Sequence, residues 1–162
     1  MGGVEKIPTD VLKEIVQIGV VVPDLDKAIA SVKRILGIEP DWVEHFHYTG
    51  VVYRGESVRA SARVASYDHF GVNLEYMEPT GPDKSMWQDY LDIARKNGYA
   101  MQHVRFSNVP DNDEVTAVLA GRGIEVYQEG NSVVNPGCKF TYYDTAKELG
   151  FVIEVLTEPK RD

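Results

Sequence analysis

The sequence has a single cysteine, no long apolar run and fewer basic than acidic residues. Cys138 is the one cysteine in 162 residues, so no disulfide can form within the chain. No apolar segment approaches the roughly 20 residues that a membrane-spanning helix needs. The 17 Lys and Arg residues against 25 Asp and Glu residues give a net charge of −8. That balance argues against a nucleic-acid-binding protein, because nucleic acid requires a basic surface.

Residues 1–6 lack the apolar core of a secretion signal, and the lone cysteine suits a reducing compartment. We therefore expect a cytoplasmic protein that contacts neither membrane nor nucleic acid. Hydrophobic residues make up 43% of the chain, which is enough for one compact unit or for two small modules that share a core.

Apolar periodicity and turn residues together predict the order of strands and helices. Asp24 is expected to cap the start of the first helix, and Gly37 to close its end. The pattern predicts strands over 14–22, 42–49, 57–67, 71–77, 99–106, 125–128, 138–143 and 151–156, and helices over 25–36, 85–96 and 112–120.

The second half of the chain repeats the first. Val22-Pro23-Asp24-Leu25-Asp26 recurs as Val109-Pro110-Asp111-Asn112-Asp113, 87 positions later. Gly37-Ile38-Glu39 recurs as Gly123-Ile124-Glu125, 86 positions later. A period this long, present twice, indicates a duplicated module rather than a solenoid.

We therefore expect an α+β fold of two βαβββ modules, residues 14–79 and 99–157, joined by a linker helix over 80–98. The modules would form a curved, partly open eight-stranded sheet around a central cleft, in a single structural unit. Paired modules commonly bury their open edges in a homodimer, so we predict one.

Four apolar strands each carry one polar side chain that can bind a metal or form a hydrogen bond. A carboxylate inside such a strand is costly unless it is paired or bound to a cation. If the first and last strands of each module lie side by side, each module contributes one pair to a common cleft. The four residues are Gln17 with Glu75, and His103 with Glu154.

Two carboxylates, an imidazole and an amide oxygen suit a divalent ion of intermediate hardness, such as cobalt, nickel, zinc or manganese. Each residue alone also has a structural explanation, such as a core histidine or a paired glutamate. The equivalent placement in both modules favours the metal, since structural drift has no reason to repeat it. His45 and His47 share a strand face. They are a weaker candidate for a zinc site, and the alternative is that they simply form part of a polar strand face. Residues 131–137 are a flap over the cleft or an ordinary loop.

These motifs resemble the vicinal-oxygen-chelate superfamily, the group of glyoxalases, bleomycin resistance proteins and dioxygenases. The resemblance is carried by Ile15–Ala28, Gly37-Ile38, Leu74-Glu75, Gly98–His103, Tyr142–Thr145 and Leu149–Glu154. Within the group, Ser85-Met86-Trp87 and the segment into His103 are most similar to the methylmalonyl-CoA epimerase branch. That branch typically has His in the first strand and Gln in the fourth, whereas Gln17 and Glu75 here are similar to some glyoxalase I enzymes.

The resemblance implies a metal-dependent isomerase that moves a proton next to a carbonyl, with the metal on the carbonyl oxygen. Glu154 is our hypothetical general base, with Glu75 as its partner or as the acid on the opposite face. Glu44 is a third candidate, with a solvated strand residue as its alternative explanation.

A 2-methyl acyl-CoA thioester is the expected substrate, and the hemithioacetal of a glyoxalase I-like lactoylglutathione lyase is the second. A non-catalytic small-molecule binding protein of the same fold would usually lack the metal set. An extradiol dioxygenase would need two histidines and one glutamate as metal ligands. The four candidate ligands include a single histidine, His103.

Overall fold

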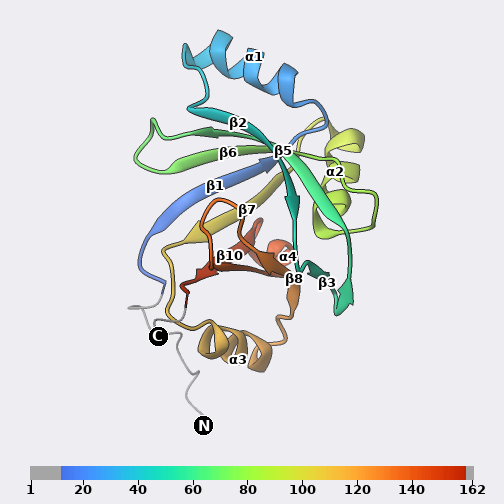
Figure 1. Ribbon diagram of the computed structural model, residues 1–162, viewed down its shortest axis with the longest axis vertical. Helices are drawn as coiled ribbons and strands as arrows, with labels where there is room; N and C mark the ends of the chain where they lie inside the picture. The colour runs from blue at the N-terminus through green and yellow to red at the C-terminus, as the bar shows by residue number, and fades with distance from the viewer. Residues whose placement is uncertain (1–11, 160–162) are drawn as a thin grey trace.

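The computed structural model describes residues 12–159, and one curved sheet dominates it (Figure 1). The N-terminal residues 1–6, which bear on the secretion signal, lie outside the described residues. In chain order the elements are β1 (Ile15–Val21), α1 (Leu25–Leu36), β2 (Trp42–Tyr48), β3 (Val52–Tyr53), β4 (Glu56–Ser57), β5 (Ala60–Tyr67), β6 (Asn73–Pro79), α2 (Met86–Asn97), β7 (Met101–Phe106), α3 (Asp113–Gly121), β8 (Val126–Asn131), β9 (Lys139–Tyr143), α4 (Ala146–Leu149) and β10 (Val152–Thr157).

All strands of the described chain join one sheet in the order β2-β5-β6-β1-β7-β10-β9-β8-β3-β4. The sheet curls into an open half-barrel, with α1 and α3 at opposite ends of the molecule and α2 at its side (Figure 1). The expected α+β fold with a curved, partly open sheet is confirmed.

The strand number is ten, and the expected eight was wrong. The two additional strands are β3 and β4, a hairpin whose turn holds Arg54 and Gly55, both at positive φ. Val52 and Tyr53 are strand residues because they pair with Glu129 and Gln128 of β8. Two residues show no periodicity, so only this long-range pairing reveals them.

The first and last strands of each repeat lie side by side, as expected. β1 pairs with β6 in parallel, β7 pairs with β10 in parallel, and β1 joins β7 antiparallel at the centre. Side chains that face inward from these four central strands therefore meet in one place.

Helix α1 begins and ends as the sequence predicted. The Asp24 side chain accepts a hydrogen bond from the Lys27 backbone N at 3.0 Å, and Gly37 closes the helix at φ 72°. The left-handed φ at this C-cap carries little steric cost for glycine.

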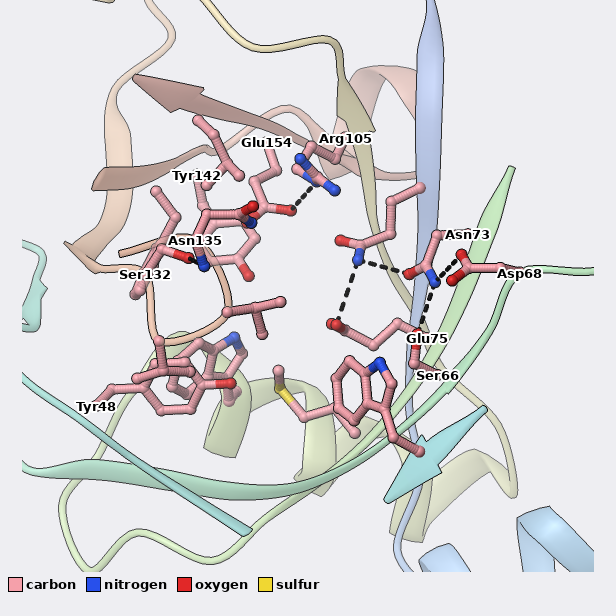
Figure 2. Close-up of a pocket in the computed structure, with 18 residues that line it drawn as sticks. Tyr48, Ser66, Asp68, Asn73, Glu75, Arg105, Ser132, Asn135, Tyr142 and Glu154 are labelled. Carbon is pink, nitrogen blue, oxygen red and sulfur yellow. Dashed lines mark hydrogen bonds and ion pairs between the residues drawn. The ribbon is translucent and has the colours of Figure 1, made fainter. Parts of the chain in front are cut away.

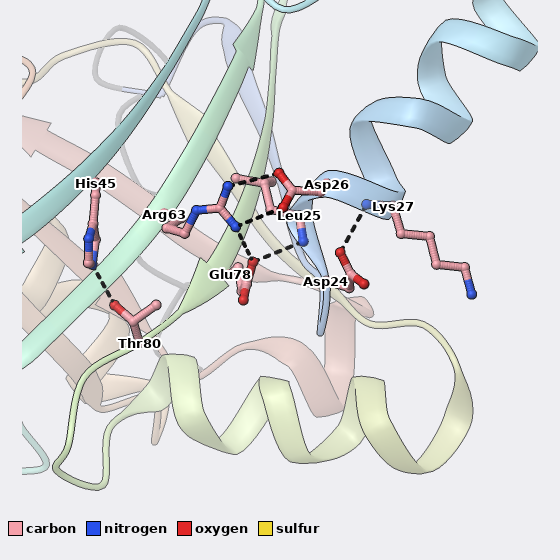
Figure 3. A network of polar contacts seen from close by, with 8 residues as sticks. All are labelled: Asp24, Leu25, Asp26, Lys27, His45, Arg63, Glu78 and Thr80. Carbon is pink, nitrogen blue, oxygen red and sulfur yellow. Dashed lines mark hydrogen bonds and ion pairs between the residues drawn. The ribbon is translucent and has the colours of Figure 1, made fainter.

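Acidic side chains also fix the start of α1 to the sheet (Figure 3). Glu78 on β6 accepts a hydrogen bond from the Leu25 backbone N at 3.0 Å and pairs with Arg63 at 3.2 Å. Arg63 in turn pairs with Asp26 at 2.8 Å. Negative charge at this end complements the helix dipole, which sets the angle of α1 on β5 and β6.

Strand β10 shows how the sheet divides its two faces. Val152 and Leu156 belong to the largest core cluster, which includes α2, whereas Ile153 and Val155 pack in the cluster that includes α3. By alternation, Glu154 lies on the face of Val152 and Leu156.

Among residues 12–159, no helix is long and apolar enough to cross a membrane.

Candidate functional site

A cavity of about 240 Å³ lies on the inner side of the curved sheet (Figure 2). One part of its lining is polar and includes Gln17, Glu75, Arg105 and Glu154. The other part is aromatic, formed by Trp42, Tyr48, Trp87, Phe140 and Tyr142. A charged end beside an aromatic wall suits a small ligand with one polar and one apolar side.

The four residues expected from the sequence lie together beside this cavity. His103 Nε2 is 2.8 Å from Gln17 Oε1 and 3.1 Å from Glu154 Oε2. Gln17 Nε2 is 3.3 Å from Glu75 Oε2. The two modules therefore contribute adjacent groups to one site, although neither sequence half contains the whole set.

An irregularity in β7 aims the imidazole. Gly19 pairs with His103 and Val20 pairs with Met101, so Gln102 is an extra residue between them. Such a bulge breaks the alternation of side chains. Consequently Gln102 Oε1 contacts Nδ1 of its own neighbour, His103, and both side chains are fully buried.

Gly19 provides the space in which the imidazole lies. A Cβ atom at this position would overlap three atoms of the His103 ring. Any other residue at position 19 must therefore displace the imidazole or the strand. The sequence alone does not reveal this role, because Gly19 looks like an ordinary glycine within a strand.

Each ring nitrogen of His103 contacts an oxygen of a neighbouring side chain. In the tautomer in which Nδ1 donates to Gln102 Oε1, the Nε2 lone pair faces Gln17 Oε1 and Glu154 Oε2. Glu154 Oε2 lies near Nε2 but is a buried oxygen without a hydrogen bond. When Glu154 is ionised, three acceptor atoms therefore face one another without a donor between them.

Burial controls the charges of these groups. Desolvation lowers the pKa of His103 to about 3, so the imidazole is neutral at physiological pH. Desolvation raises the pKa of Glu154 to about 8 and that of Glu75 to about 7, although nearby Arg105 opposes both shifts. Without a cation, ionisation of Glu154 and Glu75 is therefore less favourable than in water.

Arg105 is a functional candidate that the sequence analysis missed. It lines the cavity, its side chain is 16% exposed, and its Nε lies 4.0 Å from Glu154 Oε2. Its spacing of two residues from His103, which places both on one strand face, was the available signal.

The donor set fits a divalent ion. Ligand atoms in adjacent positions around an ion at about 2.1 Å lie about 3 Å apart, which matches the spacing of Gln17 Oε1, His103 Nε2 and Glu154 Oε2. The orphaned oxygen of Glu154 would gain a partner. Within residues 12–159, no three His, Cys, Asp or Glu side chains could hold an ion by themselves. The amide of Gln17 would therefore have to complete the set.

The other sequence candidates lie outside this group. Glu44 on β2 is exposed and is not among the described residues that line the cavity. His45 contacts Thr80 Oγ1 at 2.9 Å (Figure 3). Its ring lies 4.8 Å from that of His47. Residues 132–135 do line the cavity, as a flap or a loop over the cleft would.

Comparison with known proteins places this site in a family. The sequence model of the glyoxalase/bleomycin resistance protein/dioxygenase superfamily matches residues 16–142, which is most of the chain. The chain belongs to this superfamily. No curated protein matches the chain.

Several solved structures share the superfamily fold. Methylmalonyl-CoA epimerase from Mycobacterium tuberculosis aligns with a TM-score of 0.60 at 17% identity, covering 99% of this chain and 97% of that one. A variant of the Streptomyces coelicolor methylmalonyl-CoA epimerase, in complex with 2-nitronate-propionyl-CoA, aligns at 0.54 and 21%, covering 92% and 99%. A hypothetical protein from Bacillus halodurans aligns at 0.61 and 12%, covering 92% and 96%. At these identities the likeness establishes the fold alone.

Proposed function

We propose that this protein is a metal-dependent isomerase that moves a proton next to the carbonyl of an acyl-CoA thioester, as in methylmalonyl-CoA epimerase. The observation that carries the proposal is the convergence of three lone-pair atoms, from Gln17, His103 and Glu154, beside a cavity of small-molecule size. Buried acceptors that face one another are unfavourable unless a proton or a cation lies between them, and with ionised Glu154 that role falls to a cation.

Gln17, His103 and Glu154 would hold the ion, with Glu75 next to them, and cobalt, nickel, zinc or manganese would suit this mixed set. When bound, the ion supplies the positive charge that lowers the cost of negative charge on a carbonyl oxygen. The neutral imidazole leaves the Nε2 lone pair free for this role.

Proton transfer is assigned to the carboxylates. Glu75 lines the cavity, keeps part of its surface exposed and has a pKa of about 7, which suits a general base at physiological pH. Glu154, the general base of the sequence-based hypothesis, would here exchange roles with Glu75 and act as its partner from the opposite module. The two carboxyl groups reach the cavity from β6 and β10, the strands on either side of the central pair β1 and β7.

Arg105 favours a substrate with an anionic acyl group. A guanidinium has five N–H donors, and within the described chain its recorded hydrogen bond is one of 3.4 Å to Asn108. The remaining donors can bind a carboxylate in a planar, bidentate manner. The related epimerase in complex with methylmalonyl-CoA has a substrate of this kind.

Arg105→Gln therefore tests this choice of substrate. For the metal-loaded protein, we expect the KM for methylmalonyl-CoA to rise about tenfold. A factor of this size corresponds to the free energy of one lost charge-assisted hydrogen bond. At a pH high enough for Glu75 and Glu154 to be ionised in both proteins, turnover of a neutral hemithioacetal should not change by more than about twofold. Equal losses for both substrates would count against anion recognition.

A glyoxalase I-like lactoylglutathione lyase is the second candidate, because the Gln, Glu, His and Glu donors are similar to those of some such enzymes.

A homodimer and a cytoplasmic location remain predictions. The outer strands β2 and β4 are the open edges that a second copy would cover.

Deuterium wash-in tests the function directly. The protein loaded with Co²⁺ should catalyse the incorporation of deuterium from D2O at the α-carbon of methylmalonyl-CoA. Mass spectrometry of the substrate measures this exchange. Glu75→Gln should slow exchange by about 10²- to 10⁴-fold, the usual contribution of a general base. We expect Glu44→Gln to change exchange by less than about twofold, because Glu44 lies outside the described cavity lining.

Exchange into the hemithioacetal instead would favour the lyase. Binding of either ligand without exchange would favour a non-catalytic binding protein. Unchanged exchange in both Glu75→Gln and Glu154→Gln would refute the roles assigned to these carboxylates.

A further inference from the structure

A chain of hydrogen bonds leads from the surface to the amide of Gln17. Asp68, in the turn between β5 and β6, accepts from Asn73 Nδ2 at 2.7 Å, and Ser66 Oγ lies 2.7 Å from the same nitrogen (Figure 2). Asn73 Oδ1 then accepts from Gln17 Nε2 at 2.8 Å. Asp68 is itself anchored, because its backbone N donates to Asp41 Oδ2 at 2.7 Å.

The direction of this chain follows from chemistry. An ionised carboxylate can only accept hydrogen bonds, so the Asn73 amide must turn its nitrogen toward Asp68 and its oxygen toward Gln17. Gln17 must then turn its nitrogen toward Asn73. Its second N–H reaches Glu75 Oε2 at 3.3 Å, which leaves Oε1 as the atom that faces His103.

We infer that Asn73 and Asp68 are positioning residues that hold the Gln17 amide with its oxygen, and not its nitrogen, toward the ion. The inference rests on the proposed function for the presence of that ion. An amide differs here from an imidazole or a carboxylate, since a rotation of 180° replaces a ligand oxygen with an NH2 group that cannot bind a cation. The relay opposes this rotation, because a rotated amide would turn Gln17 Oε1 toward Asn73 Oδ1 and Glu75 Oε2, two acceptors to which an oxygen cannot donate.

The register of the sheet supports the assignment. Gln17 and Asn73 are direct partners across the parallel pair of β1 and β6, and Gln17 is 9% exposed. Neighbours in such a pair lie close enough to interact side chain to side chain. Asn73 also lines the cavity, so the relay lies next to the reacting space rather than at a distance.

A double-mutant cycle on Co²⁺ affinity tests the inference. Asn73→Leu should weaken Co²⁺ binding about 10- to 100-fold, the usual effect of losing the partner of a metal ligand. In the Gln17→Ala background, the same change should cost less than about threefold, because no amide remains to be oriented. Equal losses in both backgrounds would overturn the inference.

An exchanged pair is the matched control. In the double variant Asp68→Asn/Asn73→Asp, the carboxylate at position 73 still accepts from Gln17 and from the amide at position 68. Every hydrogen bond toward Gln17 keeps its direction, so Co²⁺ affinity should stay within about threefold of the wild type. A loss as large as that of Asn73→Leu would refute the relay. Should Asn73→Leu fail to fold, Asp68→Ala in the exposed turn should still weaken binding, and unchanged affinity would refute it.

A second measurement needs no metal. In the metal-free wild type, the side-chain NH2 protons of Gln17 should exchange slowly with water in NMR spectra, because both are hydrogen-bonded. Asn73→Leu should speed their exchange at least about tenfold. If the wild type binds no Co²⁺, the proposed metal function fails while this measurement still decides the relay. Unchanged protection in Asn73→Leu would show that no relay exists.

Discussion

The two modules present equivalent pairs of proposed metal ligands, but they hold them by different means. In the first module, the Gln17 amide is oriented by Asn73 across the sheet and by Asp68 at the surface. In the second, His103 is held by Gln102, its own neighbour in a bulged strand. An amide has two unlike ends that must be distinguished, whereas an imidazole needs its proton fixed on one nitrogen.

The residues equivalent to the relay show the same divergence. Asp68 and Asp144 occupy matching positions after β5 and β9, yet Asp144 pairs with Arg54 at 3.2 Å and takes no part in the site. The two halves therefore place the proposed ligands at equivalent positions but support them through different contacts.

Gly19→Ala should break the second module's ligand most severely. Because its Cβ would overlap the His103 ring, we expect Co²⁺ affinity to fall more than about 100-fold, the upper range for a disturbed ligand. Isothermal titration with Co²⁺ measures this. Gly121→Ala at the end of α3 is the matched control, because nothing lies within 4 Å of its added Cβ. Retained affinity in Gly19→Ala would show that the ring does not need this space.

The glutamates of the two modules should differ in how far burial raises their pKa. Glu154 and Glu75 have pKa values of about 8 and 7 in the folded protein, above the ordinary 4.5. Their contribution to stability is therefore complete below pH 4.5 and is lost as the pH rises through 7 and 8. His103, with its pKa lowered from 6.5 to about 3, acts oppositely: its contribution is complete above pH 6.5 and is lost as the pH falls through 3.

Between pH 6.5 and 8, the carboxylates thus dominate this part of the pH dependence. Metal-free protein should lose about 2 kcal/mol of unfolding free energy over this range from Glu154, and less from Glu75. Urea titrations in EDTA should show that Glu154→Gln flattens the profile more than Glu75→Gln does. Added Co²⁺ should reverse the decline, since the ionised forms bind it. A flat wild-type profile would contradict the raised pKa values.

The supporting residues allow the finest comparison. Gln102→Leu should weaken Co²⁺ binding about tenfold, because the proton on His103 Nδ1 loses its acceptor. In addition, ¹⁵N chemical shifts of metal-free His103 should report a proton on Nδ1 in the wild type and a mixture of tautomers in the variant. A wild-type proton on Nε2 would refute the assignment of three facing acceptors.

Much of the fold followed from local patterns. The bounds of α1 were predicted to the residue, because an N-cap, an apolar stripe and a C-cap glycine all act within a few positions. The short strands β3 and β4 and the single-turn helix α4 were missed, since segments of two to four residues carry no periodic signal.

The site divides in the same way. Polar residues within apolar strands stand out in the sequence, and duplication made Gln17, Glu75, His103 and Glu154 recognisable as a set. Arg105 and Gly19 were not recognised, because their importance depends on which residues face them across the sheet.

The amino-acid order therefore already contained the two modules, the caps and the four polar positions, since each is written in short-range spacing or in repetition. The bulge at Gln102, the space above Gly19 and the direction of the Gln17 amide arise from the pairing of β1 with β6 and β7. Those features depend on register between strands distant in sequence, where a shift of one residue turns a side chain to the opposite face.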